Sequence, residues 1–567
     1  YSVWLDDYGI KAEVTATKRV AYQRFTFPEG EEAHLLFDIG DRQGESGPAM
    51  DSEVIIREDG TVEGWVRTLP TYSDKYQDGA TVTMYFSADM DKEPSSLGTF
   101  LREKVFKDAR SAKGVGAGAF LSFPAGETVT ARVGLSYTSV ENARLNREIE
   151  TEGGSLDFYG ARSRSEEIWE SYLGRIRVKT PSVEDKTKFY TGLYHAVLGR
   201  GLASDVNGDY PTHDGGIGRL PSGPDGTPAF SFINTDGIWG GQWNLSQVWA
   251  LAYPDYYSDF VNTHIQVYKD SGWLGDGIAC SRYVSGVGTN QLGNAIAAAY
   301  MRGIRTFDIE AGYEAARKNE LDGENRPMGA GKMDTDQFLE RGYVPHKDSG
   351  PWPDEGWMFS ASHTLEYCFG AYAVAQMARE LGKAEDYNRL MELYRRIDAT
   401  PGIRHSYIGS GIRYDLFLDE NGFVDETSRP YFKTLVLDHT SGRLKVAPEH
   451  TEDRVLQYLG KPSFGLFERL RLEFDKICRE NGRRTGIVPY FISSHPGCTM
   501  RDMENLSRHP ALRGIFMDQV QDFTPTPMTT SSVMFYTGLD PRTMRPVFVE
   551  RDPERKKRQK SFFFRKK

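Results

Sequence analysis

The spacing of apolar residues changes twice along this chain of 567 residues, and no single fold accommodates all three patterns. Up to about residue 165, short runs such as 10–14, 61–66 and 129–135 alternate apolar and polar residues between Gly, Asp and Pro turns. From 181 to 387 the apolar residues recur every three or four positions, and long Gly-rich loops separate the runs. Beyond about 401, short apolar runs alternate with amphipathic ones. The length also suits roughly three or four domains rather than one.

Each pattern predicts its own architecture. Alternation with frequent turns predicts an antiparallel β-sandwich over residues 1–165. Helical periodicity with long loops predicts an α/α barrel over 166–387. The last region, 388–567, predicts βα units on a parallel sheet, about half of a (β/α)8 barrel. Its strands are expected at 405–409, 443–447, 486–493 and 517–522.

Charge and cysteine content exclude some classes of function. The formal net charge of −11 argues against a nucleic-acid partner over most of the surface, and no run approaches the ~20 apolar residues of a membrane span. The basic last seventeen residues read either as a nucleic-acid or membrane-surface patch or, as the favoured interpretation, as a terminal helix in solvent or a frayed end. No structural zinc or iron–sulfur ligand set is visible, because the four cysteines are far apart: Cys280, Cys368, Cys478 and Cys498.

The middle region is rich in side chains that hold sugars. Aromatic rings pack on the C–H faces of a pyranose, while carboxylates and amides bind its hydroxyls. The alternative reading of each ring is a core position. The tryptophans that cluster in or near Gly-rich loops are Trp239, Trp243, Trp249, Trp273, Trp352 and Trp357.

Several longer motifs resemble glycoside hydrolase family 92. They are FYTGLYH at 189–195, SDVNGDY at 204–210, NTDGIWG at 234–240, RTFDI at 305–309 and TLEY at 364–367 with AQMARELG at 375–382. The resemblance extends from residue 1 to about 387. It implies a β-sandwich followed by an (α/α)6 barrel, of which about half is present. It also implies a calcium-dependent exo-α-mannosidase that inverts the anomeric carbon and acts on α-mannosides or N-glycan-type sugars.

The resemblance also implies roles for individual residues. Glu366 matches the family's general acid, and Asp236 matches the aspartate that grips the sugar. Trp239, Gln242, Trp243 and Trp273 would bind substrate. From the residues alone, the favoured reading of Glu366 is a helix carboxylate in solvent, and the motif around it reverses that preference.

Part of the expected catalytic set is missing from the sequence. An inverting glycosidase also needs a carboxylate base, about 6.5–9.5 Å from the acid, to activate water. In the family, the base and the calcium ligands lie downstream of the position of Glu366, and neither segment occurs in 388–567. No metal site is therefore assigned.

The last 180 residues or so carry different motifs, which resemble the C-terminal half of YgiQ-like radical SAM proteins. These motifs are GSGIRYD at 409–415, HTSGRLKVAPEH at 439–450, VPYFISSHPGC at 488–498, QVQDFTPTPM at 519–528 and YTGLDP at 536–541. The resemblance implies S-adenosylmethionine and a [4Fe–4S] cluster in an intact enzyme. The CxxxCxxC motif of that cluster is absent here. Four residues are expected at the carboxyl ends of strands, where barrel ligands bind, and would form a half-site for S-adenosylmethionine: Ser410, Arg413, Lys445 and Glu449.

The chain therefore reads as a chimera of a partial mannosidase and a partial radical SAM protein. The leading hypothesis is a glycoside hydrolase-like protein of the exo-α-mannosidase class that is catalytically incomplete. The alternatives are a non-catalytic mannoside-binding fragment, a radical SAM remnant, or an artefactual chimera with no single function. The front half suggests an exported protein and the back half a cytoplasmic one. Each partial barrel is expected to expose one flank of its core.

Overall fold

The structure is a computed structural model. It describes residues 1–41, 47–76, 79–199, 201–235, 237–279, 282–283, 289–346, 359–383, 386–409, 411–515, 519–526 and 529–562. The chain divides into two compact units, Tyr1–Val374 and Ala375–Lys567, and each is considered by itself.

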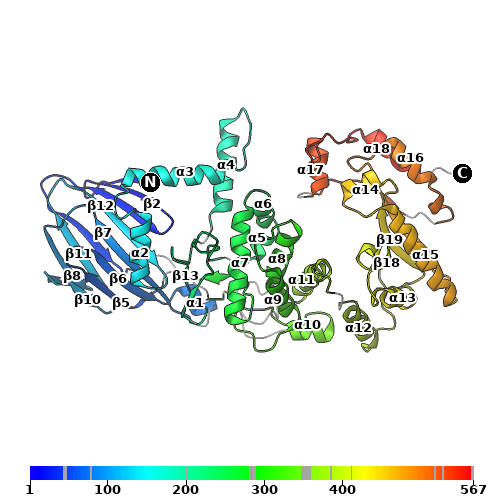
Figure 1. Ribbon diagram of the computed structural model, residues 1–567, viewed down its shortest axis with the longest axis horizontal. Helices are drawn as coiled ribbons and strands as arrows, with labels where there is room; N and C mark the ends of the chain where they lie inside the picture. The colour runs from blue at the N-terminus through cyan, green and yellow to red at the C-terminus, as the bar shows by residue number, and fades with distance from the viewer. Residues whose placement is uncertain are drawn as a thin grey trace. The chain divides into compact units, whose positions relative to one another are not determined.

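The first unit begins with a β-sandwich of two antiparallel sheets (Figure 1). The larger sheet has the order β1-β2-β3-β12-β7-β6-β5-β10 and the smaller one β4-β11-β8-β9. The strands are β1 (Ser2–Leu5), β2 (Ile10–Ala16), β3 (Val20–Thr26), β4 (Ala33–Asp38), β5 (Ala49–Ile56), β6 (Val62–Thr68), β7 (Val82–Met90), β8 (Ser96–Leu101), β9 (Lys104–Lys107), β10 (Ser111–Lys113), β11 (Ala117–Phe123) and β12 (Thr128–Ser136). Side chains from both sheets fill the core between them, including Val54, Phe86, Leu121 and Phe123. The predicted sandwich is confirmed.

Two helices lead out of the sandwich. α2 (Val140–Glu150) packs on the larger sheet, and α3 (Phe158–Leu173) follows it; the short α1 (Thr71–Tyr76) lies between β6 and β7. Ser139 starts α2 because its side chain accepts a hydrogen bond from the backbone N–H of Asn142. Asp157 caps α3 in the same way through Gly160.

The rest of the first unit is helical, as predicted. Its helices are α4 (Val183–Val197), α5 (Trp239–Gln242), α6 (Leu245–Ala252), α7 (Pro254–Ser271), α8 (Leu292–Met301), α9 (Ile309–Leu321), α10 (Thr335–Arg341) and α11 (Ser360–Glu380), whose last residues, from Ala375, belong to the second unit. Two short hairpins lie in the loops, β13 (Asp209–Pro211) with β14 (Ile217–Arg219), and β15 (Ile278–Ala279) with β16 (Arg282–Tyr283). Pro254 begins α7, and Gly272 ends it with a φ of 80°, a left-handed conformation that glycine adopts without strain.

The second unit is built on three parallel strands, β19 (Arg443–Glu449), β20 (Gly486–Ser493) and β21 (Gln519–Asp522). Its helices are α12 (Asp386–Ala399), α13 (Ser428–Asp438), α14 (Asp453–Leu459), α15 (Phe464–Glu480), α16 (Met500–Arg508), α17 (Thr530–Thr537) and α18 (Pro553–Ser561). The unit also has a small hairpin, β17 (Leu418–Asp419) with β18 (Gly422–Phe423), and two 3-10 turns, Tyr414–Leu416 and Pro510–Leu512. The helices α14 to α16 connect the strands, as βα repetition requires.

One predicted strand is wrong. Residues 405–409 form no strand, although the backbone N–H of Ile408 donates to the carbonyl of His439 and Ile412 makes a single parallel bridge to Val446. This segment runs beside β19 without a continuous ladder. Residues 517 and 518 of the last predicted strand lie outside the described residues, and its remainder is β21.

The core of the second unit rests largely on one face of α15. Phe467, Leu470, Phe474 and Ile477 are each at most 1% exposed and recur at helical spacing. Each such side chain contributes about 1.5–3 kcal/mol on burial. Among the described residues, no helix is long and apolar enough to cross a membrane.

Candidate functional site

Helix α11 carries Glu366 on a half-buried face. Its Oε2 atom is buried and has no hydrogen-bond partner. Burial raises the pKa of this carboxyl, while a hydrogen bond from the Trp239 side chain and the charge of Lys332 act in the opposite direction. The net result is a pKa above the ordinary value, so Glu366 keeps its proton to a higher pH than an exposed glutamate does.

A buried ion pair lies beside the same helix. Lys332 Nζ is 2.5 Å from Glu320 Oε1, and the two side chains are only 2% and 7% exposed. The Lys332 ammonium also lies 5.0 Å from the centre of the Tyr367 ring, and the Tyr367 hydroxyl donates to the carbonyl of Met333. Gly370, one turn beyond Glu366, makes room for the pair, because a Cβ there would be 2.5 Å from Glu320 Oε1 and closer still to Lys332 Nζ.

Exposed aromatic rings lie next to Glu366. Trp239 and Trp243, at the two ends of α5, are 43% and 44% exposed. The Trp243 ring stacks on Phe369 of α11, with centroids 5.8 Å apart and 13° between the ring planes. Two contacts therefore join α5 to α11, one from Trp239 to Glu366 and one from Trp243 to Phe369. The arrangement combines a protonatable carboxyl with flat, accessible rings, which suits a sugar.

The other residues named from the sequence have different positions. Gln242 is buried, and its Oε1 atom has no partner. Trp273 is 6% exposed, within a core cluster that includes Phe232 and Tyr283. Lys318 Nζ lies 4.1 Å from the centre of its ring, so the alternative reading of a core position fits Trp273 best. Asp236, Trp352 and Trp357 lie outside the described residues.

Sequence reasoning missed a set of buried amides around α8 and α9. Both amide atoms of Gln291 and of Asn294 are buried without a hydrogen-bond partner, as is Asn319 Oδ1. Gly293 lies between Gln291 and Asn294 in the sequence, and a Cβ at Gly293 would be 3.9 Å from Glu320 Oε1. Buried polar atoms without partners usually indicate a missing water, ion or ligand. The segment QLGNA at 291–295 did not predict these buried amides, because asparagine and glutamine are ordinary surface residues.

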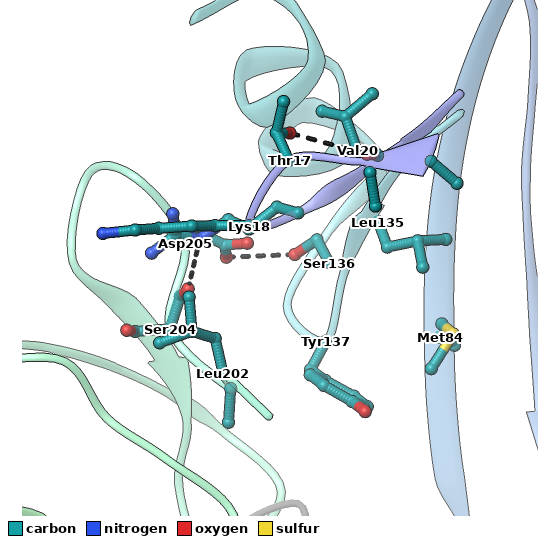
Figure 2. A pocket seen from close by; sticks show the side chains of 14 residues that line it. Thr17, Lys18, Val20, Met84, Leu135, Ser136, Tyr137, Leu202, Ser204 and Asp205 are labelled. Atoms are coloured by element: carbon teal, nitrogen blue, oxygen red, sulfur yellow. Dashed lines mark hydrogen bonds between the residues drawn. The ribbon is translucent and has the colours of Figure 1, made fainter. Parts of the chain in front are cut away.

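Two hollows lie elsewhere in the first unit. One of about 420 Å³ is bordered by the end of α4, the 234–245 segment and α7, and its wall includes Asn234, Thr235, Trp249, Tyr253 and Tyr256. The other, of about 220 Å³, lies between the sandwich and the 202–205 segment (Figure 2).

Asp205 borders the smaller hollow, and its carboxylate accepts three hydrogen bonds. Its Oδ2 accepts from Ser136 at 3.0 Å and from Thr138 at 2.5 Å, and its Oδ1 accepts from Asn146 at 2.7 Å. Burial raises the pKa of this carboxyl despite these bonds. Because its bonding capacity is used within the protein, Asp205 has a structural role that joins the sandwich to the helical part.

Two residues of the expected half-site, Arg413 and Glu449, each pair with another side chain, and the charge of Arg413 also acts on Glu449. Arg413 pairs with Asp415, at 2.6 and 2.8 Å. Glu449 ends β19 with a φ of 66° and pairs with Lys461 at 3.3 Å, and burial raises its pKa. Lys445 lies near the start of β19 rather than at its carboxyl end, which corrects the predicted position. Ser410 lies outside the described residues.

A buried thiol lies close to the end of β20. Cys498 Sγ is 3.5 Å from His450 Nε2 and 3.7 Å from Gln559 Oε1. Burial raises the pKa of the Cys498 thiol to about 12 and lowers that of His450 to about 4, so both are neutral at physiological pH. A protonated, enclosed thiol is a poor metal ligand.

Comparison with protein families finds separate matches in the front and in the last part of the chain. Residues 1–136 match the glycosyl hydrolase family 92 N-terminal domain, and residues 142–395 match the catalytic domain of that family. Residues 518–566 match a domain of unknown function, DUF3362.

Curated relatives match the C-terminal part of the chain. A UPF0313 protein of Bacteroides thetaiotaomicron is 46% identical over 181 residues, and one of Porphyromonas gingivalis is 45% identical over 181. Each alignment covers 32% of this chain. It covers 29% of the first relative and 28% of the second, so the chain spans less than a third of their lengths.

Solved structures match the front part. The structure of a family GH92 alpha-mannosidase from Bacteroides thetaiotaomicron is 26% identical to this chain, with a TM-score of 0.60. The match covers 70% of this chain and 50% of the mannosidase. A family GH92 inverting mannosidase of the same organism is 22% identical, with a TM-score of 0.58. The match covers 72% of this chain and 51% of that mannosidase, and it supports similarity of fold only.

Proposed function

We propose that this chain, which joins a glycosyl hydrolase family 92 part to a part related to UPF0313 proteins, binds an α-mannoside through its first unit. The site is the α5–α11 surface, with Glu366 as the general acid of an incomplete exo-α-mannosidase. The observation that carries the proposal is Glu366 itself, a carboxyl with a raised pKa that contacts an accessible tryptophan.

The chemistry of an inverting glycosidase explains why such a carboxyl matters. The departing glycosidic oxygen must receive a proton, so the acid has to be protonated when the substrate binds. Partial burial raises the pKa of Glu366 and so favours its protonated form, while the Trp239 side chain hydrogen-bonds to the carboxyl. Trp239 and Trp243 would pack against the sugar ring, and Asp236 would bind its hydroxyls.

Catalysis is incomplete because the sequence offers no base. The family resemblance puts the base and the calcium ligands after the position of Glu366, where this chain continues as a UPF0313 relative. Glu320 is a poor substitute, since Lys332 already binds its carboxylate. The described residues also contain no group of three or more His, Cys, Asp or Glu side chains that could hold a metal ion, so they do not fit calcium.

The barrel assignments belong to the same proposal. We infer that α4 to α11 are part of an (α/α)6 barrel and that β19 to β21 with their helices are part of a (β/α)8 barrel. The β-sandwich and helical region of family 92 structures support the first, and the parallel order of the three strands supports the second.

Binding and turnover can be tested separately on the whole chain. Tryptophan fluorescence is titrated with methyl α-mannoside and with mannoimidazole, and release of nitrophenol from 4-nitrophenyl α-mannoside is followed with and without calcium. We expect saturable quenching without turnover. Trp239→Ala should abolish the quenching, whereas Trp4→Ala, which removes a 57% exposed ring of β1, should leave it unchanged. Absence of quenching by either sugar contradicts the proposal, and turnover that Glu366→Gln abolishes contradicts the incomplete catalytic set.

The similarity to UPF0313 proteins supports a second candidate, a radical SAM remnant. Cys478 and Cys498 are both buried, and the enclosed Cys498 does not fit a cluster ligand. We therefore expect no iron and no S-adenosylmethionine bound after anaerobic reconstitution, as measured by iron assay and equilibrium dialysis. A stoichiometric cluster would favour this second function instead.

A further inference from the structure

Helix α11 is apolar on both of its sides. Its inner side is fully buried and includes Tyr367, Val374 and Met377. Its outer side carries Leu365, Phe369 and Tyr372, which are 72%, 39% and 46% exposed. A helix with apolar residues all round belongs to the interior of a larger domain, because water-facing positions are normally polar.

The exposed side chains form one continuous strip with a neighbouring ring. Leu365, Cys368, Phe369 and Tyr372 recur at helical spacing, and Trp243 stacks on Phe369 at its edge. These five residues are called the α11 apolar face below. Scattered single apolar residues are ordinary on a protein surface, but a strip of this kind normally marks a contact with another chain or domain.

Helix α4, the first helix of the helical part, also exposes apolar residues. In Figure 1, α4 projects beyond the group formed by α5 to α9. Its side chains Tyr194 and Leu198, at and just after its carboxyl end, are 37% and 54% exposed. Tyr194 packs on Trp169 of α3, but the first and the last long helices of this part both carry exposed apolar residues, as expected when consecutive helices of a closed ring are absent between them.

The comparison with solved structures indicates what would provide that cover. This chain matches 50% of the family GH92 alpha-mannosidase, and the family's catalytic domain ends here at residue 395. We propose that the α11 apolar face is a docking surface for amphipathic helices of a separate polypeptide that carries the other half of a family 92 catalytic domain. The proposal rests on the family match and on exposure, and it holds whether or not the first unit binds a sugar.

A second copy of this chain is a less suitable occupant. A symmetric pair would bring two identical α11 faces together and leave α4 uncovered in both copies. A half-domain that follows α11 in a ring would instead reach both helices at once.

The test uses the full chain and one defined probe. The probe is the part of the Bacteroides thetaiotaomicron family GH92 alpha-mannosidase that this chain does not cover, produced as a separate polypeptide and, where needed, refolded from urea together with the chain. Complex formation is measured by size-exclusion chromatography with light scattering. Leu365→Glu and Phe369→Glu are compared with Leu36→Glu, which changes a 66% exposed residue of β4 in the sandwich. Circular dichroism verifies that each variant is folded.

We expect a complex of one chain with one probe, weakened at least tenfold by Leu365→Glu and by Phe369→Glu and unaffected by Leu36→Glu. Two results overturn the proposal. The first is a chain that pairs with itself through this face, seen as a dimer that Leu365→Glu converts to a monomer. The second is a monomer that takes up no probe, or that takes it up equally well in all three variants. Sugar titrations on the same samples report separately on the proposed function.

Discussion

The ammonium of Lys332 lies 2.5 Å from the carboxylate of Glu320, and both side chains are almost completely removed from water. Burial raises the pKa of Glu320, and Lys332 counteracts that effect. Such a pair adds little net stability relative to apolar side chains, but loss of one partner leaves a buried charge uncompensated. The pair therefore makes the surroundings of Glu366 sensitive to single substitutions.

Glu320→Gln is expected to destabilise the first unit by about 3–5 kcal/mol, because Lys332 would remain buried without a counter-charge. Urea unfolding followed by fluorescence measures the loss. The double variant Glu320→Leu with Lys332→Met removes both charges and should recover most of the stability. A single variant as stable as the parent chain would mean that water reaches Lys332.

Gly370→Ala should destabilise the same unit by about 1–3 kcal/mol, because its new methyl group would overlap Lys332 and Glu320. The matched control is Gly192→Ala in α4, where nothing lies within 4 Å of the added Cβ. There we expect a gain of about 0.5–1 kcal/mol from helix propensity alone. Equal effects at the two positions would contradict the packing described around Gly370.

The fluorescence of Trp239 should titrate with Glu366. The indole hydrogen-bonds to this carboxyl, whose pKa is raised by burial above its ordinary value of 4.5. Emission should therefore change with a midpoint above pH 4.5, and Glu366→Gln should remove that step. A midpoint below 4.5 in the parent chain would show that Lys332 and Trp239 outweigh burial.

Acid should weaken the sandwich through Glu63. Burial alone would raise its pKa, but hydrogen bonds from Arg144, Arg57 and Ser87 lower it to about 2. A carboxyl with a lowered pKa stabilises the fold fully above its unfolded pKa of 4.5, and this contribution of about 3 kcal/mol disappears as the pH falls from 4.5 to 2. Glu63→Gln should flatten the stability profile in that window, whereas Glu58→Gln should not. Denaturation midpoints between pH 2 and pH 6 give the comparison.

Local patterns predicted the elements better than the sites. Helical periodicity identified the helical region and alternation identified the sandwich, because both depend on near neighbours in sequence. The segment 405–409 looked like a strand but lacks a continuous ladder, since pairing depends on distant β19. Nothing in the sequence around Lys332 and Glu320 predicted that they form a buried ion pair. Charged residues normally face water, and only the fold of α9 and α11 around them removes them from it.

The hydrogen bonds of Asp205 have a practical consequence for dividing this protein. The sequence pattern invites a cut near residue 165, which would release the sandwich as a separate piece. Such a piece would keep Ser136, Thr138 and Asn146 but lose the carboxylate that binds all three. It would also lose the Ser204 carbonyl, to which Arg19 donates at 2.7 Å. A sandwich intended for crystallisation or for binding assays should therefore extend through the 202–209 segment, so that it keeps the hydrogen bonds of Asp205 and of the Ser204 carbonyl.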